Sequence, residues 1–209
     1  MKYLHVFVVF LLLGCAGSKT YQSSNFTDNE KDLIRAGGED DPMRVLKITN
    51  KQDSIILRTK SKPVIPGSED PLEDPLLNLF IERLYRTVTD SGSLGVGIAA
   101  PQVGILKQII WVQRFDKENF PFEVYLNPVI RQYSDKKQKC REGCLSVPDR
   151  MDTLNSRSYA ILIEYDRPDG SNHIEMVEDF TAVIFQHEID HLNGIIYLDH
   201  LKEEMEQAD

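Results

Sequence analysis

The chain has 209 residues, of which 41% are apolar and 27% are charged, and its formal net charge at pH 7 is −9. One globular domain with an ordinary hydrophobic core accounts for this length and composition. The acidic balance, without a basic patch that has interleaved aromatic residues, excludes nucleic acid as an expected partner, because phosphates would repel the chain.

Residues 1–14 have the pattern of a bacterial lipoprotein signal peptide. A lysine precedes an apolar run that ends in the sequence LLGC, which is typical of a lipobox. The run is too short for a transmembrane helix, which needs about 20 apolar residues, but its length fits a signal peptide. We therefore expect acylation of Cys15 and a protein anchored to a membrane of the bacterial cell envelope. In the alternative, the run is a buried first strand and the protein stays in the cytoplasm.

A polar tether is predicted between this signal and the folded domain. Residues 15–41 show no hydrophobic periodicity, and the segments expected to form the domain follow over 42–209. After cleavage, Cys140 and Cys144 are the remaining thiols, too few for a disulfide framework, so the fold must depend on core burial. In an extended segment their Cα atoms would lie about 13 Å apart, beyond the roughly 7 Å that a disulfide tolerates.

The first predicted helix begins at Asp74-Pro75, an N-cap residue followed by proline at the first helical position. Apolar residues recur at helical spacing over 76–88, so one face of this helix is expected in the core. Glycines within 92–95 end the helix and begin a loop that lets backbone approach a ligand.

Three later segments rich in β-branched and aromatic residues predict strands, and turns follow the second and the third. The strands cover residues 108–113, 122–126 and 160–165, and the turns lie at 127–128 and 168–170.

A second helix is predicted over 178–192 and is ended by Gly194. Its expected inward face is formed by Phe180, Val183, Ile184, His187 and His191. Strands followed by one such helix favour an α+β fold, with mixed or antiparallel β-sheets around a central metal-binding helix.

The sequence HEIDH at residues 187–191 predicts a metal site on this helix. Residues four apart share a helix face, so His187 and His191 can bind one metal while Glu188 stands beside it. Such a site needs a third protein ligand, and Cys144 in the sequence EGCLS is the best candidate, at a strand edge or turn next to a proline. HExxH alone occurs on many helices, and a lone cysteine is usually inert packing. The combination indicates a mononuclear metallohydrolase.

Three segments resemble the signature motifs of the peptide deformylases: GVGIAAPQ at 95–102, EGCLS at 142–146 and QHEIDHLNG at 186–194. The first has Ile98 where leucine is more common in the family, a substitution that conserves volume. The likeness spans about residues 42–200, and the short interval between the first two motifs resembles the type I members. It implies removal of the N-formyl group from N-formylmethionyl peptides, with release of formate. It also implies ferrous iron as the metal, with zinc, nickel or cobalt able to use the same ligands.

The resemblance implies roles for six residues besides the metal ligands. Gln102, through its side-chain amide, and Leu145, through its backbone N–H, would stabilise the oxyanion. Val96 and Gly97 would hold the substrate as an extended strand, and Glu142 would orient its neighbours beside the substrate. Glu188 would act first as general base and then as general acid.

One departure from the family concerns substrate binding. An arginine that members often place a few residues after EGCLS falls on Met151 here, with Arg150 next to it. We expect this change to affect substrate affinity and choice, and to leave the metal chemistry intact.

Two other functions remain open from the sequence. A zinc metalloprotease also uses HExxH, but Tyr197 stands where a metzincin would need its third ligand. An envelope-tethered protein could instead bind formylated peptides with little catalysis. The predicted export also makes a co-translational role doubtful, so the hypothesis is that the substrates are exported or released formyl peptides.

Overall fold

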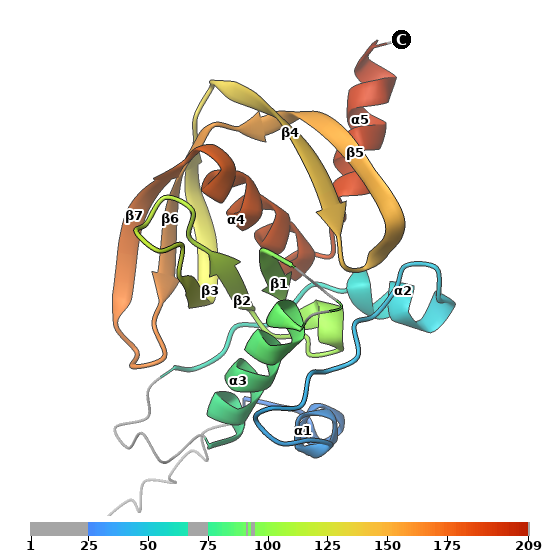
Figure 1. Ribbon diagram of the computed structural model, residues 1–209, viewed down its shortest axis with the longest axis vertical. Helices are drawn as coiled ribbons and strands as arrows, with labels where there is room; N and C mark the ends of the chain where they lie inside the picture. The colour runs from blue at the N-terminus through green and yellow to red at the C-terminus, as the bar shows by residue number, and fades with distance from the viewer. Residues whose placement is uncertain (1–24, 67–74, 91, 93–94, 209) are drawn as a thin grey trace, which may run out of the picture.

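The computed structural model describes residues 25–66, 75–90, 92 and 95–208 (Figure 1). The predicted signal peptide, Cys15 and the first part of the predicted tether lie outside these residues. Within the part that is described, no helix combines the length and the apolar composition needed to cross a membrane.

Two antiparallel sheets form the framework, which confirms the predicted α+β class. The larger sheet has five strands in the order β1-β2-β3-β6-β7. These strands are β1 Gly97–Ala99, β2 Ile109–Gln113, β3 Phe122–Tyr133, β6 Ala160–Asp166 and β7 Asn172–Glu178. The smaller sheet is a hairpin of β4 Lys137–Cys144 and β5 Val147–Ser158.

Helix α4, Asp179–Leu192, lies between the five-stranded sheet and the β4–β5 hairpin (Figure 1). Covered on both sides, it buries Phe185 and Ile189 in the core that the sheet forms. The helix ends at Leu192 with Asn193 as its C-cap, and Gly194 follows with φ of 75°. A Cβ at Gly194 would lie 2.5 Å from the carbonyl oxygen of Arg58, so glycine is required both by the backbone angle and by the space. The predicted central helix and its stop are confirmed.

Four further helices surround this framework: α1 Asp28–Arg35, α2 Lys51–Leu57, α3 Pro75–Thr89 and α5 Tyr197–Ala208. Helix α3 matches the first predicted helix and buries Phe80 and Leu84 in the core. A short 3-10 helix, η1 Ala100–Val103, follows β1 and positions Gln102.

Helix α1 corrects the predicted tether over 15–41, because residues from 26 onward pack on the domain. Phe26 and Ile34 are buried in the same core as α3. Thr27 and Glu30 form a capping box at the start of the helix, and Arg83 donates hydrogen bonds to the carbonyl oxygens of two residues near its end. Two apolar side chains are too few to produce a periodic pattern, so the sequence alone did not indicate this helix.

The turn predicted at residues 127–128 is also wrong, because β3 continues through it to Tyr133. The strand is irregular there: its register with β6 shifts between Leu126 and Val129, and Asn127 has φ of 49°. The Asn127 side chain holds this conformation by pairing with both the N–H and the C=O of Val64. An asparagine-proline pair thus marks a bulge here.

Candidate metal centre and active site

Cys144, His187 and His191 come together from the β4–β5 hairpin and α4. Their ligand atoms all lie within 4.8 Å of one another, and Cys144 Sγ is 3.2 Å from His191 Nε2. The two imidazole rings face each other edge-on, with centroids 5.0 Å apart. One sulfur and two nitrogens at these separations suit a tetrahedral cation with one open position. In the described part of the chain, this is the only group of three such side chains.

The electrostatics of these three residues favour a thiolate. Burial alone would raise the pKa of the Cys144 thiol, but the two histidines outweigh it and lower that pKa well below its usual value. Burial would lower the pKa of His187, but hydrogen bonds with Cys144 and Glu142 raise it well above its usual value. Metal ligation requires a thiolate and neutral imidazoles, so a cation would take the place of the protons that these groups share.

Glu142 orients His187. Its Oε2 lies 2.8 Å from His187 Nδ1, which leaves Nε2 of the same ring facing the cluster. Burial would raise the pKa of Glu142, but hydrogen bonds from His187 and Arg157 outweigh it and lower the pKa to about 2. The carboxylate therefore stays ionised behind the imidazole. Glu142 lines the cavity, as expected, but its charge is turned toward His187 and Arg157.

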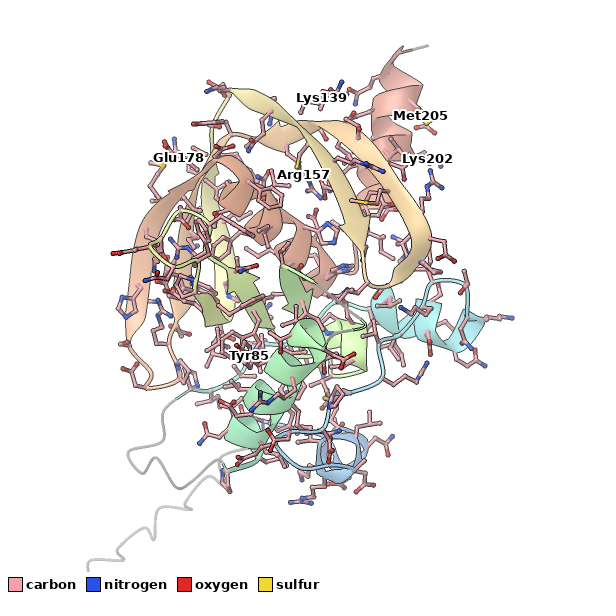
Figure 2. The ribbon with its side chains drawn as sticks, in the orientation of Figure 1. Tyr85, Lys139, Arg157, Glu178, Lys202 and Met205 are labelled. Atoms are coloured by element: carbon pink, nitrogen blue, oxygen red, sulfur yellow. The ribbon has the colours of Figure 1, made fainter. Side chains whose placement is uncertain are left out.

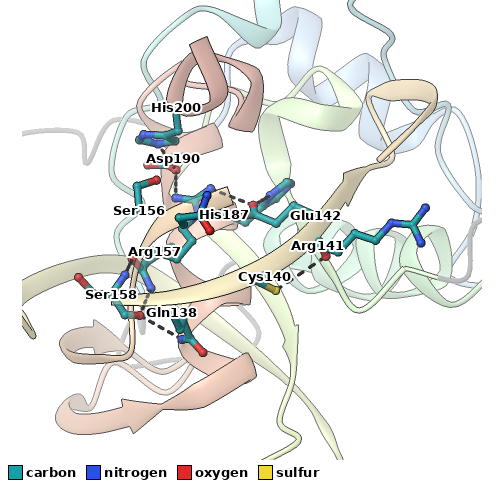
Figure 3. A network of polar contacts seen from close by, with 12 residues as sticks. Gln138, Cys140, Arg141, Glu142, Ser156, Arg157, Ser158, His187, Asp190 and His200 are labelled. Carbon is teal, nitrogen blue, oxygen red and sulfur yellow. Dashed lines mark hydrogen bonds and ion pairs between the residues drawn. The ribbon is translucent and has the colours of Figure 1, made fainter. Parts of the chain in front are cut away.

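The polar network continues from Glu142 through the hairpin to the last helix (Figure 3). Arg157 donates two hydrogen bonds to Glu142 and one, of 2.6 Å, to Asp190. Asp190 is also 2.8 Å from His200 Nε2 on α5. Figure 2 shows Arg157 on the side of the hairpin that faces α4, whereas Lys139 lies on its outer side. None of Arg157, Asp190 and His200 was predicted from the sequence. Asp190 lies within the HEIDH motif, but no sequence pattern indicates the other two.

Glu188 is buried beside the three candidate ligands. Burial raises the pKa of its carboxyl to about 7, against the opposing effect of His187 and His191. Its Oε2 has no hydrogen-bond partner among the described residues. A cation at the neighbouring ligands would oppose this rise in pKa and favour the ionised base. A buried carboxylate with a free oxygen at an open metal position can accept a proton from water.

Gly97 on β1 lies against Glu188 and must be glycine. A Cβ at this position would lie 2.5 Å from Glu188 Oε1 and 2.8 Å from Ile184 Cγ2. The space is too small for any side chain, so the backbone of β1 runs directly past the carboxylate. Val96 and Gly97 both line the cavity.

Gln102 presents its amide nitrogen to the site. Its Oε1 accepts a hydrogen bond of 2.8 Å from the N–H of Ala99, and this bond fixes the orientation of the amide. Its Nε2 is then 3.6 Å from Cys144 Sγ and 3.3 Å from Ser146 Oγ. Leu145 lies in the two-residue turn directly after Cys144. Both predicted donors are thus next to the candidate ligands.

A cavity of about 670 Å³ opens over these residues. The same face of α4 that presents His187 lines it with Phe180, Val183 and Ile184, as the sequence predicted. Met151 lines the opposite side and is 52% exposed, and Arg150 beside it is paired with Asp152. The combination of an apolar wall with few polar groups is typical of a small-ligand or peptide site.

Tyr197 does not supply the third metal ligand that the metzincin alternative would need. Its ring stacks on His187 with centroids 6.0 Å apart, and its hydroxyl donates to Asp152. The residue thus packs behind the site, which removes the geometric basis of the metzincin alternative.

Residues 45–207 match a family model described as polypeptide deformylase. A peptide deformylase of Desulforudis audaxviator is 43% identical over 157 residues, covering 75% of this chain and 94% of that protein. One from Leptospira biflexa is 35% identical over 166 residues, covering 76% and 87%.

Solved structures agree with the sequence comparisons. A class I type b peptide deformylase from Acinetobacter baumannii with Met-Ala-Ser bound superimposes with a TM-score of 0.65 at 33% identity, covering 76% of this chain and 98% of that one. The peptide deformylase of Thermotoga maritima gives a TM-score of 0.64 at 31% identity, covering 76% and 97%. The arrangement of Cys144, His187, His191 and Glu188 and these matches lead to one conclusion: the chain belongs to the peptide deformylase family.

Proposed function

We propose that this protein is a metal-dependent hydrolase that removes the formyl group from N-formylmethionyl peptides and releases formate. The observation that supports this most directly is the buried Glu188 carboxylate, with one oxygen unpartnered, beside the Cys144, His187 and His191 ligand atoms. The reaction is inferred from membership of the family, and the groups that would perform it are inferred from this geometry.

In this proposal Cys144, His187 and His191 hold the metal, and Glu142 keeps His187 in the required orientation. A divalent cation bound there would supply Lewis acidity, which lowers the pKa of water and polarises the formyl carbonyl. Ferrous iron is the proposed physiological metal. Zinc, nickel and cobalt would fit the same sulfur and nitrogen ligands, which do not discriminate among them.

Glu188 would move the proton. It accepts a proton from the attacking water and then delivers this proton to the amine nitrogen as the formyl C–N bond breaks. Its burial favours the protonated form, and a bound cation would favour the ionised form, so these opposing effects suit a group that both accepts and donates a proton.

Gln102 Nε2 and the backbone N–H of Leu145 would donate to the oxyanion that forms at the formyl oxygen. The Gln102 amide is held by Ala99 before substrate binds, so the donor needs no reorganisation during the reaction. Val96 and Gly97 would receive the peptide backbone, and the apolar wall of α4 would contact the methionine side chain. The structure of the Acinetobacter baumannii relative with Met-Ala-Ser bound supports a peptide ligand.

The N-terminal sequence supports a further part of the proposal, that the enzyme is a lipoprotein anchored through Cys15. Its substrates would then be exported or released formyl peptides. Metabolic labelling with a fatty-acid analogue, compared between wild type and Cys15→Ser, tests this part. We expect the label to appear in the wild type and to be absent from Cys15→Ser. Equal labelling of the wild type and Cys15→Ser, with both found in the cytosol, would contradict anchoring through Cys15.

The activity is tested with three peptides of identical length: formyl-Met-Ala-Ser, acetyl-Met-Ala-Ser and Met-Ala-Ser. The full chain, purified and loaded with ferrous iron without oxygen, should release formate from the first and leave the other two unchanged. Cleavage of Met-Ala-Ser would indicate a protease. Tight binding of the formylated peptide without formate release would indicate a binding protein.

A further inference from the structure

Lys47 contacts the turn that contains the candidate ligand Cys144, although it lies about a hundred residues earlier in the chain. Its Nζ donates a hydrogen bond of 2.5 Å to the carbonyl oxygen of Leu145. The lysine is half-buried, and its own backbone N–H is fixed by Asp53 Oδ2 at 3.0 Å. Asp53 in turn receives two hydrogen bonds from Arg44. Lys47 is therefore fixed both at its backbone N–H and at its ammonium group.

The segment around Lys47 joins the two parts of the site. The N–H of Leu46 donates to the carbonyl of Gln102 at 2.7 Å, and the N–H of Ile48 donates to the carbonyl of Ser146 at 3.0 Å. Residues 46–48 thus bridge the 3-10 helix that holds Gln102 and the turn that follows Cys144. Lys47 is the charged residue in the middle of this bridge.

One peptide group connects the Lys47 ammonium to the Cys144 sulfur. The carbonyl that Lys47 contacts belongs to the Leu145–Ser146 peptide, and the N–H of that same peptide lies 3.4 Å from Cys144 Sγ, to which it donates. A cation on the carbonyl oxygen withdraws electron density from the amide and makes its N–H a stronger donor. The effect of the charge therefore reaches the sulfur through a single polarised amide.

We propose that Lys47 is a positioning residue that tunes the Cys144 thiolate as a metal ligand through the Leu145–Ser146 peptide. A stronger N–H···S hydrogen bond lowers the electron donation of the sulfur, which leaves the metal more electrophilic. The same contact fixes Leu145, the proposed oxyanion donor. This inference rests on the metal site of the proposed function, and concerns a residue outside the three motifs.

The cobalt-loaded full-length protein tests this proposal by its absorption spectrum. Charge transfer from a thiolate to cobalt gives a band whose energy falls when the sulfur becomes a better donor. Lys47→Met should move this band to longer wavelength, and Lys47→Arg should restore it toward the wild-type position. Lys51→Met, which removes an equal charge from an exposed position at the start of α2, should leave the band unchanged.

A structural role without tuning would lower the melting temperature and leave the band in place, so an unchanged wavelength in Lys47→Met overturns the proposal. If Lys47→Met does not fold, Lys47→Gln replaces it, because glutamine keeps a hydrogen-bond donor but carries no charge. A Lys47→Gln band at the same wavelength as that of Lys47→Arg would also overturn the proposal. The absence of any sulfur-to-cobalt band in the wild type would instead contradict Cys144 as a ligand and remove both proposals. Formate release is not needed for any of these outcomes.

Discussion

Glu142 Oε2 lies 2.8 Å from His187 Nδ1, and both side chains are buried behind the candidate metal position. The carboxylate fixes the ring so that its other nitrogen faces Cys144 and His191. Because Arg157 donates to both oxygens of the same carboxylate, the orientation of one ligand depends on a buried ion pair in the hairpin.

Glu142→Ala should weaken metal binding by roughly 10- to 100-fold, because the His187 ring loses the partner that sets its orientation. The measurement is the rate of metal loss to a chelator. Glu164→Ala is the matched control, since it removes a glutamate from an exposed pair with Arg131. Equal rates of metal loss in the wild type and Glu142→Ala would contradict the proposed role.

The two cysteines allow a direct test of the ligand set. Cys144→Ala, His187→Ala and His191→Ala should each purify without stoichiometric metal, because a site of three ligands does not tolerate the loss of one. Cys140→Ala removes an equivalent thiol four residues earlier on β4 and should retain the metal. Metal content per chain after gel filtration decides between these results. Full metal content in Cys144→Ala would exclude the sulfur as a ligand.

Gly97→Ala tests the close approach of β1 to the proposed base. The added methyl group would lie 2.5 Å from Glu188 Oε1, so the carboxylate must move. We expect kcat/KM for formate release to fall by roughly a hundredfold while the metal is kept. Gly38→Ala, where the added carbon meets its nearest neighbour at 3.7 Å on the surface, should have no effect. Activity equal to wild type in Gly97→Ala would refute this contact.

The loss of stability at acidic pH should depend in part on Glu123 on β3. Burial would raise the pKa of Glu123, but hydrogen bonds from Lys117, Tyr125 and Arg167 outweigh it and lower the pKa from 4.5 to about 2. A carboxyl with a lowered pKa in the folded state stabilises the protein above its unfolded pKa and loses this contribution as the pH falls toward 2. The free energy of unfolding should therefore fall more steeply between pH 5 and pH 2 in the wild type than in Glu123→Gln.

Urea unfolding at several values of pH measures this difference. Glu118→Gln, at an exposed position in the loop that precedes β3, should follow the wild-type curve. Parallel curves for the wild type and Glu123→Gln would contradict the prediction.

The parts of the fold that the sequence predicted are those with strong periodicity. Helix α4 has apolar residues at helical spacing before its glycine stop, and β2 and β6 each contain two isoleucines among further apolar residues. These segments bury their side chains in the core, so burial and pattern agree. The three motifs then located the candidate ligands and the base without structural information.

The missed parts are held by polar contacts. In α5, which no predicted element covered, Glu204 accepts hydrogen bonds from the backbone N–H groups of Asn155 and Ser156. Strand β5 has few buried apolar residues, and Arg157 is buried there because it pairs with Glu142 and Asp190 from other elements. Such partners lie far apart in the sequence, and no local pattern records them.

The central claim is that Glu188 performs proton transfer at a metal held by its neighbours. Formate release from formyl-Met-Ala-Ser should be measured for the ferrous-loaded wild type and Glu188→Ala, with metal content determined on the same samples. We predict equal metal content and a loss of turnover of roughly 10²- to 10⁴-fold in the variant. Retained turnover in metal-loaded Glu188→Ala would contradict the claim.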